Sequence, residues 1–369
     1  MKIAQVAPLY ESVPPKLYGG TERVVYYLTE ELIKQGHDVT LFASGDSQTN
    51  ARLIVPVEDA LRLKEGHYDP IVYHMILLQD IIERADDFDV IHFHIDYLHF
   101  PFSQLISTPH LTTLHGRLDL PELQDVYNKF SDQPVVSISN NQRGPLPQAN
   151  WIGTVYHGLP IDLLPFGEGK GNYLAFLGRI SPEKGLEKAI EWAKEANMEL
   201  KIAAKIDDAD KKYFDSEIKH LLNDPLIEYI GEINEEEKRS FLGDALALLF
   251  PINWCEPFGM VMIESMACGT PVIAFDKGSV PEVIDEGKTG FIVKDTAQAV
   301  EVIHQLSDFS RENVRKIFED RFTAERMTKD YIKLYMQLSE KGNTKLSSPG
   351  LADGTISIHS EKAFKNKAV

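Results

Sequence analysis

Residues 246–269 constrain the fold most, because they read as a buried strand, a sharp turn and a helix. The apolar run at 246–252 has the length and composition of a strand covered on both faces. Pro257 has no N–H for a β-ladder, so the strand must end before it. Apolar residues recur at helical spacing after Gly259. In an open parallel sheet such a corner faces the crevice where ligands bind, so this stretch predicts an α/β domain with a ligand site at this edge.

Two carboxylates bracket this corner. Glu256 lies in the turn and Glu264 on the helix, with seven residues between them. The free N–H groups at the helix start, from Gly259 to Val261, suit a phosphate. Glu256 could then accept hydrogen bonds from a sugar, and Glu264, about 9 Å further along the helix, from a second ring such as ribose. The alternative is that Glu256 caps the helix and Glu264 is a solvated surface residue.

The composition bounds the class of protein and its partners. The chain has 369 residues, enough for two domains with a core each. Its net charge of −18 argues against nucleic acid or a broad anionic membrane as partner, although peripheral membrane contact through a local patch stays open. The two cysteines imply no disulfide framework and favour a reducing compartment. No apolar run reaches membrane-spanning length, and residues 1–10 read as a strand and not as a signal peptide, so we expect a cytoplasmic protein.

The first half of the chain begins with a β-α-β pattern. A strand at 3–7 precedes a loop that ends in Gly19 and Gly20, a helix to about residue 35, for which Gly20 or Thr21 is the expected N-cap, and a strand at 39–43. Two glycines at a helix start suit a phosphate, but they lack the GxGxxG fingerprint, and a packing role is as plausible. Further strands are expected at 90–94, 110–114 and 135–138, and residues 46–85 allow at most a short strand and helices.

Histidines cluster in this half of the chain. His115 directly follows the strand at 110–114, where an imidazole could bind a sugar hydroxyl or polarise a leaving group. The alternative is a ring whose hydrogen bonds are satisfied by local backbone. His92 and His94 alternate on another strand, but no zinc-motif spacing surrounds them, so we predict no metal site.

The second half repeats the alternation after a Gly- and Pro-containing stretch. Strands are expected at 173–178, 200–206, 227–231, 246–252, 271–275 and 280–284, with helices between them, including one near 209–222. This pattern predicts a second doubly wound domain. Two helices with a break near 322–323 fill residues 310–340. The expected organisation is a first domain at 1–158, a linker at 159–172, a second domain at 173–322, a helix crossing back to the first domain at 323–341, and a mobile tail at 342–369.

Two cations follow the first strand of the second domain. Arg179 and Lys184 lie in the segment GRISPEKG, with four residues between them and a proline in the turn. At a strand's carboxyl edge they suit a diphosphate, although ordinary solvated surface is the alternative. Asp208 and Asp210 have the spacing of a DxD metal motif, but after a strand they more readily start a helix.

Together these segments resemble the retaining glycosyltransferases of family 4, over roughly residues 1–340. The most specific segment is 256–293, where Glu256 and Glu264 match the family's E-x7-E motif. GRISPEKG resembles its phosphate-binding segment and YGGTERV its N-terminal glycine loop. The resemblance implies an α/β protein of GT-B fold, with two Rossmann-like doubly wound domains that face each other across a cleft.

The resemblance also implies an activity. A hexose would pass, with retention, from a UDP- or GDP-linked donor on the second domain to a hydroxyl of a saccharide, lipid or small molecule on the first, without a metal or cofactor. In this comparison Arg179 and Lys184 neutralise the diphosphate, Glu264 binds the ribose, and His115 lies near the sugar's C6 hydroxyl. The implied catalytic residues are His115, Arg179, Lys184 and Glu256, and the implied donor-binding residues are Gly19, Gly20, Lys205, Phe258, Gly259, Met260, Val261 and Glu264.

Departures from the family pattern leave alternatives open. Lys205 and its neighbours stand where many relatives have a Gly-rich turn, and His157 stands where asparagine is common. A GT-B sugar-nucleotide epimerase would bind the same donor without an acceptor. A non-enzymatic two-domain sugar-binding protein is a further alternative, but it would leave Arg179 and Lys184 without a role.

Overall fold

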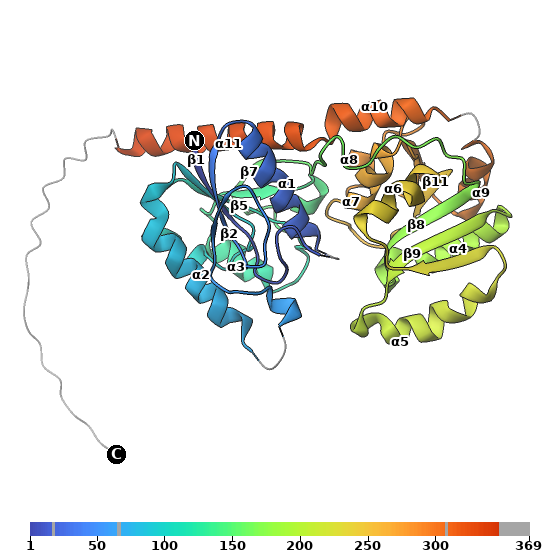
Figure 1. The fold of residues 1–369 in the computed structure, drawn as a ribbon, viewed down its shortest axis with the longest axis horizontal. Coiled ribbons are helices and arrows are strands. Elements are labelled where there is room, and N and C mark those ends of the chain that lie inside the picture. Colours follow the sequence, from blue (N-terminus) through green and yellow to red (C-terminus); the bar gives the residue numbers. More distant parts are fainter. Residues whose placement is uncertain (17–18, 65–67, 307–308, 347–369) are drawn as a thin grey trace, which may run out of the picture.

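The computed structural model describes residues 1–16, 19–64, 68–306 and 309–346, without the side chains of residues 63 and 341–346. The strands form two parallel sheets, each with helices on both sides, in two domains that lie next to each other (Figure 1). The first domain is drawn in blue to green and the second in green to orange. The chain therefore has the doubly wound architecture expected from the alternating strand and helix pattern.

The first sheet has seven parallel strands in the order β3-β2-β1-β4-β5-β6-β7. α1 packs an apolar face that includes Val24, Leu28 and Leu32 into the core. α2 begins with Asp69 as its N-cap, whose side chain accepts from the amide of Ile71. The elements are β1 (Lys2–Val6), α1 (Gly20–Lys34), β2 (Asp38–Phe42), β3 (Arg52–Ile54), α2 (Pro70–Arg84), β4 (Val90–Phe93), β5 (His110–Thr113), α3 (Leu123–Lys129), β6 (Val135–Ser137) and β7 (Trp151–Thr154).

The second sheet has six parallel strands in the order β10-β9-β8-β11-β12-β13. Its first strand, β8, pairs with β9 and β11, so residues at the carboxyl ends of these strands meet at one edge. The elements are β8 (Tyr173–Arg179), α4 (Leu186–Glu195), β9 (Glu199–Lys205), α5 (Lys211–Tyr213), β10 (Ile227–Gly231), α6 (Glu235–Gly243), β11 (Ala247–Phe250), α7 (Met260–Ala267), β12 (Val272–Phe275), α8 (Val280–Val283), β13 (Gly290–Val293), α9 (Thr296–His304), α10 (Arg311–Arg321) and α11 (Ala324–Leu346).

The last helix, α11, leaves the second domain and runs along the first (Figure 1). The crossover is fixed by paired backbone bonds: the amide of Leu159 donates to Phe322 (2.9 Å) and the amide of Ala324 donates to Leu159 (2.7 Å). Met327, Tyr331 and Tyr335 of α11 are fully buried, in a core shared with α1. The C-terminal helix is thus part of the first domain's core.

Four details differ from the sequence-based expectations. Residues 280–283 form the short helix α8 instead of a strand, with Pro281 in its first turn. The helix expected near 209–222 is a series of 3₁₀, α and π turns. Gly19, and neither Gly20 nor Thr21, is the N-cap of α1. Finally, α11 continues to Leu346, so the tail does not begin at residue 342; the rest of that expected tail, residues 347–369, lies outside the described residues.

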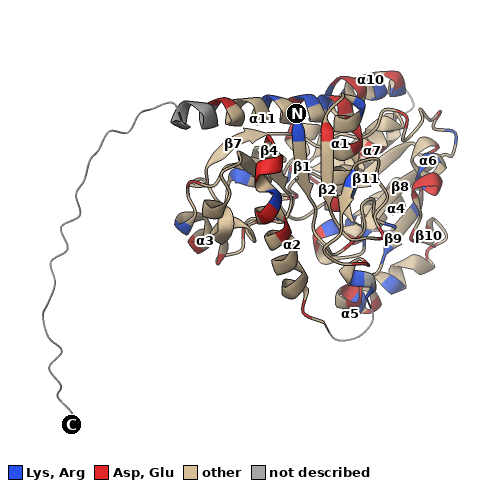
Figure 2. Cartoon of the chain, turned by 60° about the vertical axis from the view of Figure 1, so that its left-hand side comes forward, with Lys and Arg blue, Asp and Glu red and all other residues tan. Residues whose placement is uncertain are grey.

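Acidic and basic side chains are interspersed along the surface helices, as on α10 (Figure 2), which is the pattern of an ordinary solvated surface. Among the described residues, no helix is both long enough and apolar enough to cross a membrane.

Candidate active site

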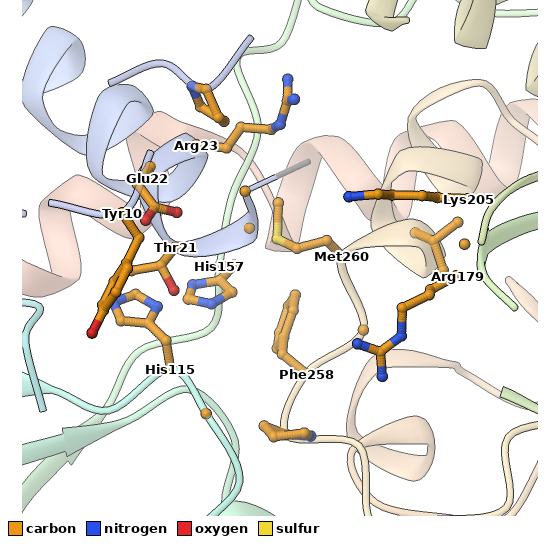
Figure 3. A pocket seen from close by; sticks show the side chains of 18 of the residues that line it. Tyr10, Thr21, Glu22, Arg23, His115, His157, Arg179, Lys205, Phe258 and Met260 are labelled. Atoms are coloured by element: carbon orange, nitrogen blue, oxygen red, sulfur yellow. The ribbon is translucent and has the colours of Figure 1, made fainter. Parts of the chain in front are cut away.

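A cleft of about 740 Å³ separates the two domains and is lined by residues of both. His115 and His157 approach it from the first domain, and Arg179 and Lys205 from the second, with Phe258 and Met260 between them (Figure 3). The structure brings together all twelve residues singled out in the sequence: Gly19, Gly20, His115, Arg179, Lys184, Lys205, Glu256, Phe258, Gly259, Met260, Val261 and Glu264.

The corner between β11 and α7 turns at Gly259, which has φ 77° and is the N-cap of α7. A Cβ there would lie 2.9 Å from the Met262 side chain and in a backbone conformation that other residues rarely adopt. The first intrahelical bond runs from the amide of Met262 to Gly259 O (3.0 Å), which leaves the preceding amides of the first turn without intrahelical partners. An anion-binding helix start therefore faces the cleft.

Glu256 does not cap this helix. Its carboxylate forms an ion pair with Lys184 and accepts a hydrogen bond from Trp254 Nε1 (2.9 Å). Its backbone is packed against Gly278, where a Cβ would come within 2.4 Å of the Glu256 amide nitrogen, and the amide of Ser279 donates to Glu256 O (3.0 Å). The capping alternative is wrong, because Gly259 is the N-cap and the turn that carries Glu256 packs against the loop between β12 and α8.

Glu264 is not a solvated surface residue either. It is 6% exposed and pairs with Lys238 Nζ on α6 at 2.8 Å. Both side chains line the cleft. A buried carboxylate held by a single cation keeps oxygen lone pairs that can accept hydrogen bonds from ligand hydroxyls.

The cleft cations are each paired with carboxylates. Arg179 contacts Glu183 (2.5 Å), Asp210 (3.3 Å) and Asp207 (3.7 Å). Lys205 contacts Asp207 at 2.9 Å. Residues 208–210 form a 3₁₀ turn, as expected for a helix start. Any anionic ligand must therefore compete with, or add to, these carboxylates.

The two glycines at the start of α1 have different surroundings. A Cβ at Gly19 would come within 2.7 Å of Pro15, whereas a Cβ at Gly20 would meet nothing within 4 Å. Packing accounts for Gly19 and does not account for Gly20, which lies at the helix start in the cleft wall.

His115 belongs to a histidine cluster on the first-domain wall. Its Nε2 lies 2.9 Å from His94 Nδ1, and its ring stacks on His157 with centroids 5.3 Å apart. Burial lowers the pKa of His115 to about 3 and holds the pKa values of His94 and His157 well below their usual range. The rings are neutral at neutral pH, and the alternative in which His115 is satisfied by local backbone is wrong.

Sequence reasoning missed residues on the first-domain wall of the cleft, including Tyr10, Glu22 and Asp96. Burial raises the pKa of Glu22 to about 7. Asp96 follows β4 with φ 50°, which is uncommon outside glycine, and desolvation of its carboxyl raises its pKa to about 6. The sequence signal that could have identified Asp96 as a cleft residue is its position just after the carboxyl end of a central strand.

The cleft also contains a contact between the domains. Arg23 of α1 forms an ion pair with Glu235 of α6, which also accepts a hydrogen bond from the Tyr27 hydroxyl (3.0 Å).

Among the described residues, no group of three or more His, Cys, Asp or Glu side chains is arranged to hold a metal ion.

Solved structures share this architecture. Sucrose-phosphate synthase from Thermosynechococcus elongatus superposes with a TM-score of 0.76 at 19% identity, over 92% of this chain and 100% of that one. Anabaena HepE in complex with UDP-glucose gives 0.67 at 17% identity, over 93% and 100%. Two parallel α/β domains around one shared cleft define the GT-B fold.

Sequence comparisons identify the family. The model "Glycosyltransferase Family 4" matches residues 18–152, and "Glycosyl transferases group 1" matches residues 166–328. O-antigen chain mannosyltransferase C of Escherichia coli is 24% identical over 91% of this chain and 99% of its own. Phosphatidyl-myo-inositol mannosyltransferase of Mycolicibacterium smegmatis is 24% identical over 79% and 81%. The chain belongs to glycosyltransferase family 4 and is a hexosyltransferase of that type.

Proposed function

We propose that the protein transfers a hexosyl group from a nucleoside-diphosphate sugar to an acceptor hydroxyl, with retention of configuration and without a metal ion or cofactor. The observation that carries the proposal is the grouping of Arg179, Lys184 and Lys205 with the start of α7 on one wall of the cleft, opposite His115. Fixed cations and free amides stabilise the negative charge that develops on a departing diphosphate. They provide what a divalent ion provides in metal-dependent transferases.

Without a donor, the carboxylates that pair with these cations hold the cationic side chains in position. Lys184 is held by Glu256 and Arg179 by Glu183, so the cations are positioned before the ligand arrives. On binding, the diphosphate takes over Lys184 and frees Glu256 to accept from the sugar's hydroxyls. Glu264, held by Lys238, accepts from the ribose.

In the proposed reaction, the acceptor oxygen attacks C1 on the face from which the diphosphate leaves. The bond between C1 and the phosphate oxygen breaks, and its electron pair stays with the diphosphate. The acceptor proton passes to a diphosphate oxygen. Each donor consumed gives one glycoside and one nucleoside diphosphate, and a covalent intermediate on Glu256 is the less favoured route.

The first-domain wall would bind the acceptor. Tyr10 and Tyr97 offer partly exposed aromatic faces, at 43% and 39%, beside Asp96 in the same cleft. Aromatic faces with a neighbouring carboxylate suit a hydroxylated acceptor such as a saccharide or the headgroup of a glycolipid. The two unpaired cysteines, of which Cys255 is exposed, support action in a reducing compartment such as the cytoplasm.

A donor screen tests the function. The named relatives are mannosyltransferases, and the HepE structure contains UDP-glucose, so GDP-mannose and UDP-glucose are the first donors to incubate with the protein in the presence of EDTA. Release of sugar or glycoside plus nucleoside diphosphate supports the proposal. Recovery of an epimerised donor would favour an epimerase, and binding without turnover would favour a sugar-binding protein.

Two substitutions localise the activity. Lys184→Ala and Glu264→Ala should each lower donor turnover at least about 100-fold, because each removes charge or hydrogen bonding at the reacting donor. Lys188→Ala is the matched control, since Lys188 pairs with Glu191 outside the cleft (2.7 Å). Near-normal turnover in both cleft variants would refute the assignment of the site.

A further inference from the structure

A buried chain of polar groups joins His115 to the C-terminal helix. His115 Nε2 lies 2.9 Å from His94 Nδ1, and His94 Nε2 lies 2.8 Å from Gln5 Oε1. Gln5 Nε2 in turn donates to the hydroxyl of Tyr335 on α11 (3.1 Å). His94, Gln5 and Tyr335 are at most 2% exposed, so water does not compete for these bonds.

The chemistry of an amide gives this chain a direction. Gln5 Oε1 can only accept, so the proton of neutral His94 lies on Nε2. His94 Nδ1 is then a bare lone pair, which accepts from His115 Nε2–H. Because a neutral imidazole carries one ring proton, His115 Nδ1 has none.

The hydrogen bonds beyond Gln5, through Tyr335 and His92, also have a defined direction. The Tyr335 hydroxyl accepts from Gln5 and lies 2.8 Å from His92 Nδ1, to which it donates. His92 Nε2–H then donates to Thr113 Oγ1 (2.7 Å). Turning the Gln5 amide around would reverse every proton on both sides of it. Gln5 therefore sets the polarity of the whole chain.

The chain ends at Nδ1 of His115, a residue that lines the cleft. This nitrogen is buried and has no hydrogen-bond partner among the described residues, although buried ring nitrogens are rarely left unpaired. The ring lies beside His157 on the cleft wall (Figure 3). We propose that Gln5 is a positioning residue that acts through His94 and fixes the proton of His115 on Nε2, so that Nδ1 is presented to the ligand as an acceptor.

This tautomer has a consequence that rests on the proposed function. The glycosyl group gains positive charge at the transition state, as in other glycosyl transfers with oxocarbenium-like character. A bare lone pair on the wall that faces the sugar favours that charge, whereas an N–H would oppose it. Reversing the proton should therefore lower kcat about tenfold and leave KM within about twofold, because the ground-state sugar is uncharged.

The tautomer can be read in the free protein by NMR of ¹⁵N-histidine-labelled samples, with His115→Gln to assign the ring. We expect His115 to carry its proton on Nε2 in the wild type. Gln5→Met removes the acceptor of His94. It should give a mixture of the two neutral His115 tautomers, with the proton on Nε2 in some molecules and on Nδ1 in others. Tyr335→Phe, a smaller change that removes the acceptor of the Gln5 amide, should give the same mixture. Gln133→Met is the matched control, because Gln133 accepts from a different histidine, His110 (3.4 Å).

Each outcome of the NMR and turnover measurements either supports or overturns a proposal. A proton on Nδ1 of His115 in the wild type, or an unchanged Nε2–H in a folded Gln5→Met or Tyr335→Phe variant, overturns the proposal. A change in tautomer with the predicted loss of kcat in UDP-glucose or GDP-mannose turnover supports it. Wild-type protein that turns over no nucleotide sugar would instead refute the proposed function, and the NMR result on Gln5 would stand independently.

Discussion

Mild acid should destabilise the first domain through its buried histidines. Burial lowers the pKa values of seven histidines there: His37, His74, His92, His94, His99, His115 and His157. Their rings stay neutral in the folded protein. In the unfolded chain they become charged below about pH 6.5. Between the pKa values of the folded and of the unfolded protein, the unfolded state therefore binds more protons. The free energy of unfolding falls as the pH falls through this range.

His115 sets the scale of the effect. Its pKa of about 3 keeps it neutral at pH 5, which is about 1.5 units below the value of an unfolded histidine. At about 1.4 kcal/mol per unit, this one ring costs about 2 kcal/mol between pH 7 and pH 5. Every other histidine that stays neutral to pH 5 adds a similar amount.

Three acids of the first domain oppose this trend, because desolvation raises the pKa values of Glu11, Glu22 and Asp96. The pKa of Glu22 is raised to about 7, so protonation of its carboxyl in the folded state adds about 2 kcal/mol of stability over the same interval. Glu22 alone offsets about one histidine out of seven, and Asp96, with a pKa raised to about 6, offsets part of another. The net change is a loss of several kcal/mol, a large part of the 5–15 kcal/mol typical of a domain.

Urea unfolding at pH 7, 6 and 5 measures the loss, followed by the fluorescence of Trp151 in a variant whose other tryptophans, Trp192 and Trp254, are phenylalanine. His99→Gln should reduce the loss by about 2 kcal/mol, because His99 is fully buried against Phe93 and does not line the cleft. Exposed His220→Gln should leave it unchanged. An unfolding free energy of the first domain that is equal or higher at pH 5 would refute the reasoning.

Three further predictions concern the second domain. Removing charge alone, by Lys184→Met, should lower donor turnover about 100-fold while the melting temperature stays within a few degrees, and an equal loss in Lys188→Met would contradict it. Gly278→Ala should displace the Glu256 turn, because its Cβ would lie 2.4 Å from that backbone; a drop in kcat with an unchanged far-UV spectrum is expected, and full activity would sink the idea. Arg311→Met should lower the free energy of unfolding by about 3–5 kcal/mol in urea titrations. The reason is that Arg311 donates to the carbonyls of Gly167 (3.0 Å), Gly243 (2.9 Å) and Ala245 (2.8 Å). A change under about 1 kcal/mol would count against this role.

The fold was predictable because local pattern and global architecture agree. Short apolar runs that end in glycine, proline or charged residues give strands, and amphipathic segments between them give crossover helices. Residues 280–284 have the apolar content of a strand, but Pro281 favours the first turn of a helix, and the structure has the helix α8 there. An apolar run this short does not distinguish strand from helix.

The cleft residues were predictable for a topological reason. Arg179 and Lys205 are the last residues of β8 and β9, Glu256 lies in the turn after β11, and parallel strands gather their carboxyl ends at one edge. Their partners were not predictable. Lys238 reaches Glu264 from a different helix, and Tyr335 reaches Gln5 from the other end of the chain, so these pairings depend on helix packing that no spacing encodes. His157, the residue that departs from the family pattern, gains an interpretation only as the ring stacked on His115.

The paired charges also explain how a chain of net charge −18 can present a site for an anion. The cations of the second-domain wall are held by nearby carboxylates, Asp207 and Asp210 on Arg179 and Glu256 on Lys184, so each positive charge is already compensated in the ligand-free cleft. Under the proposed function, a diphosphate that enters would not need distant cations, because it would replace these carboxylates as the acceptor on side chains already in place. In the proposed function, Glu256 released from Lys184 would then accept from hydroxyls of the same ligand, so one rearrangement would serve both the diphosphate and the sugar of the donor.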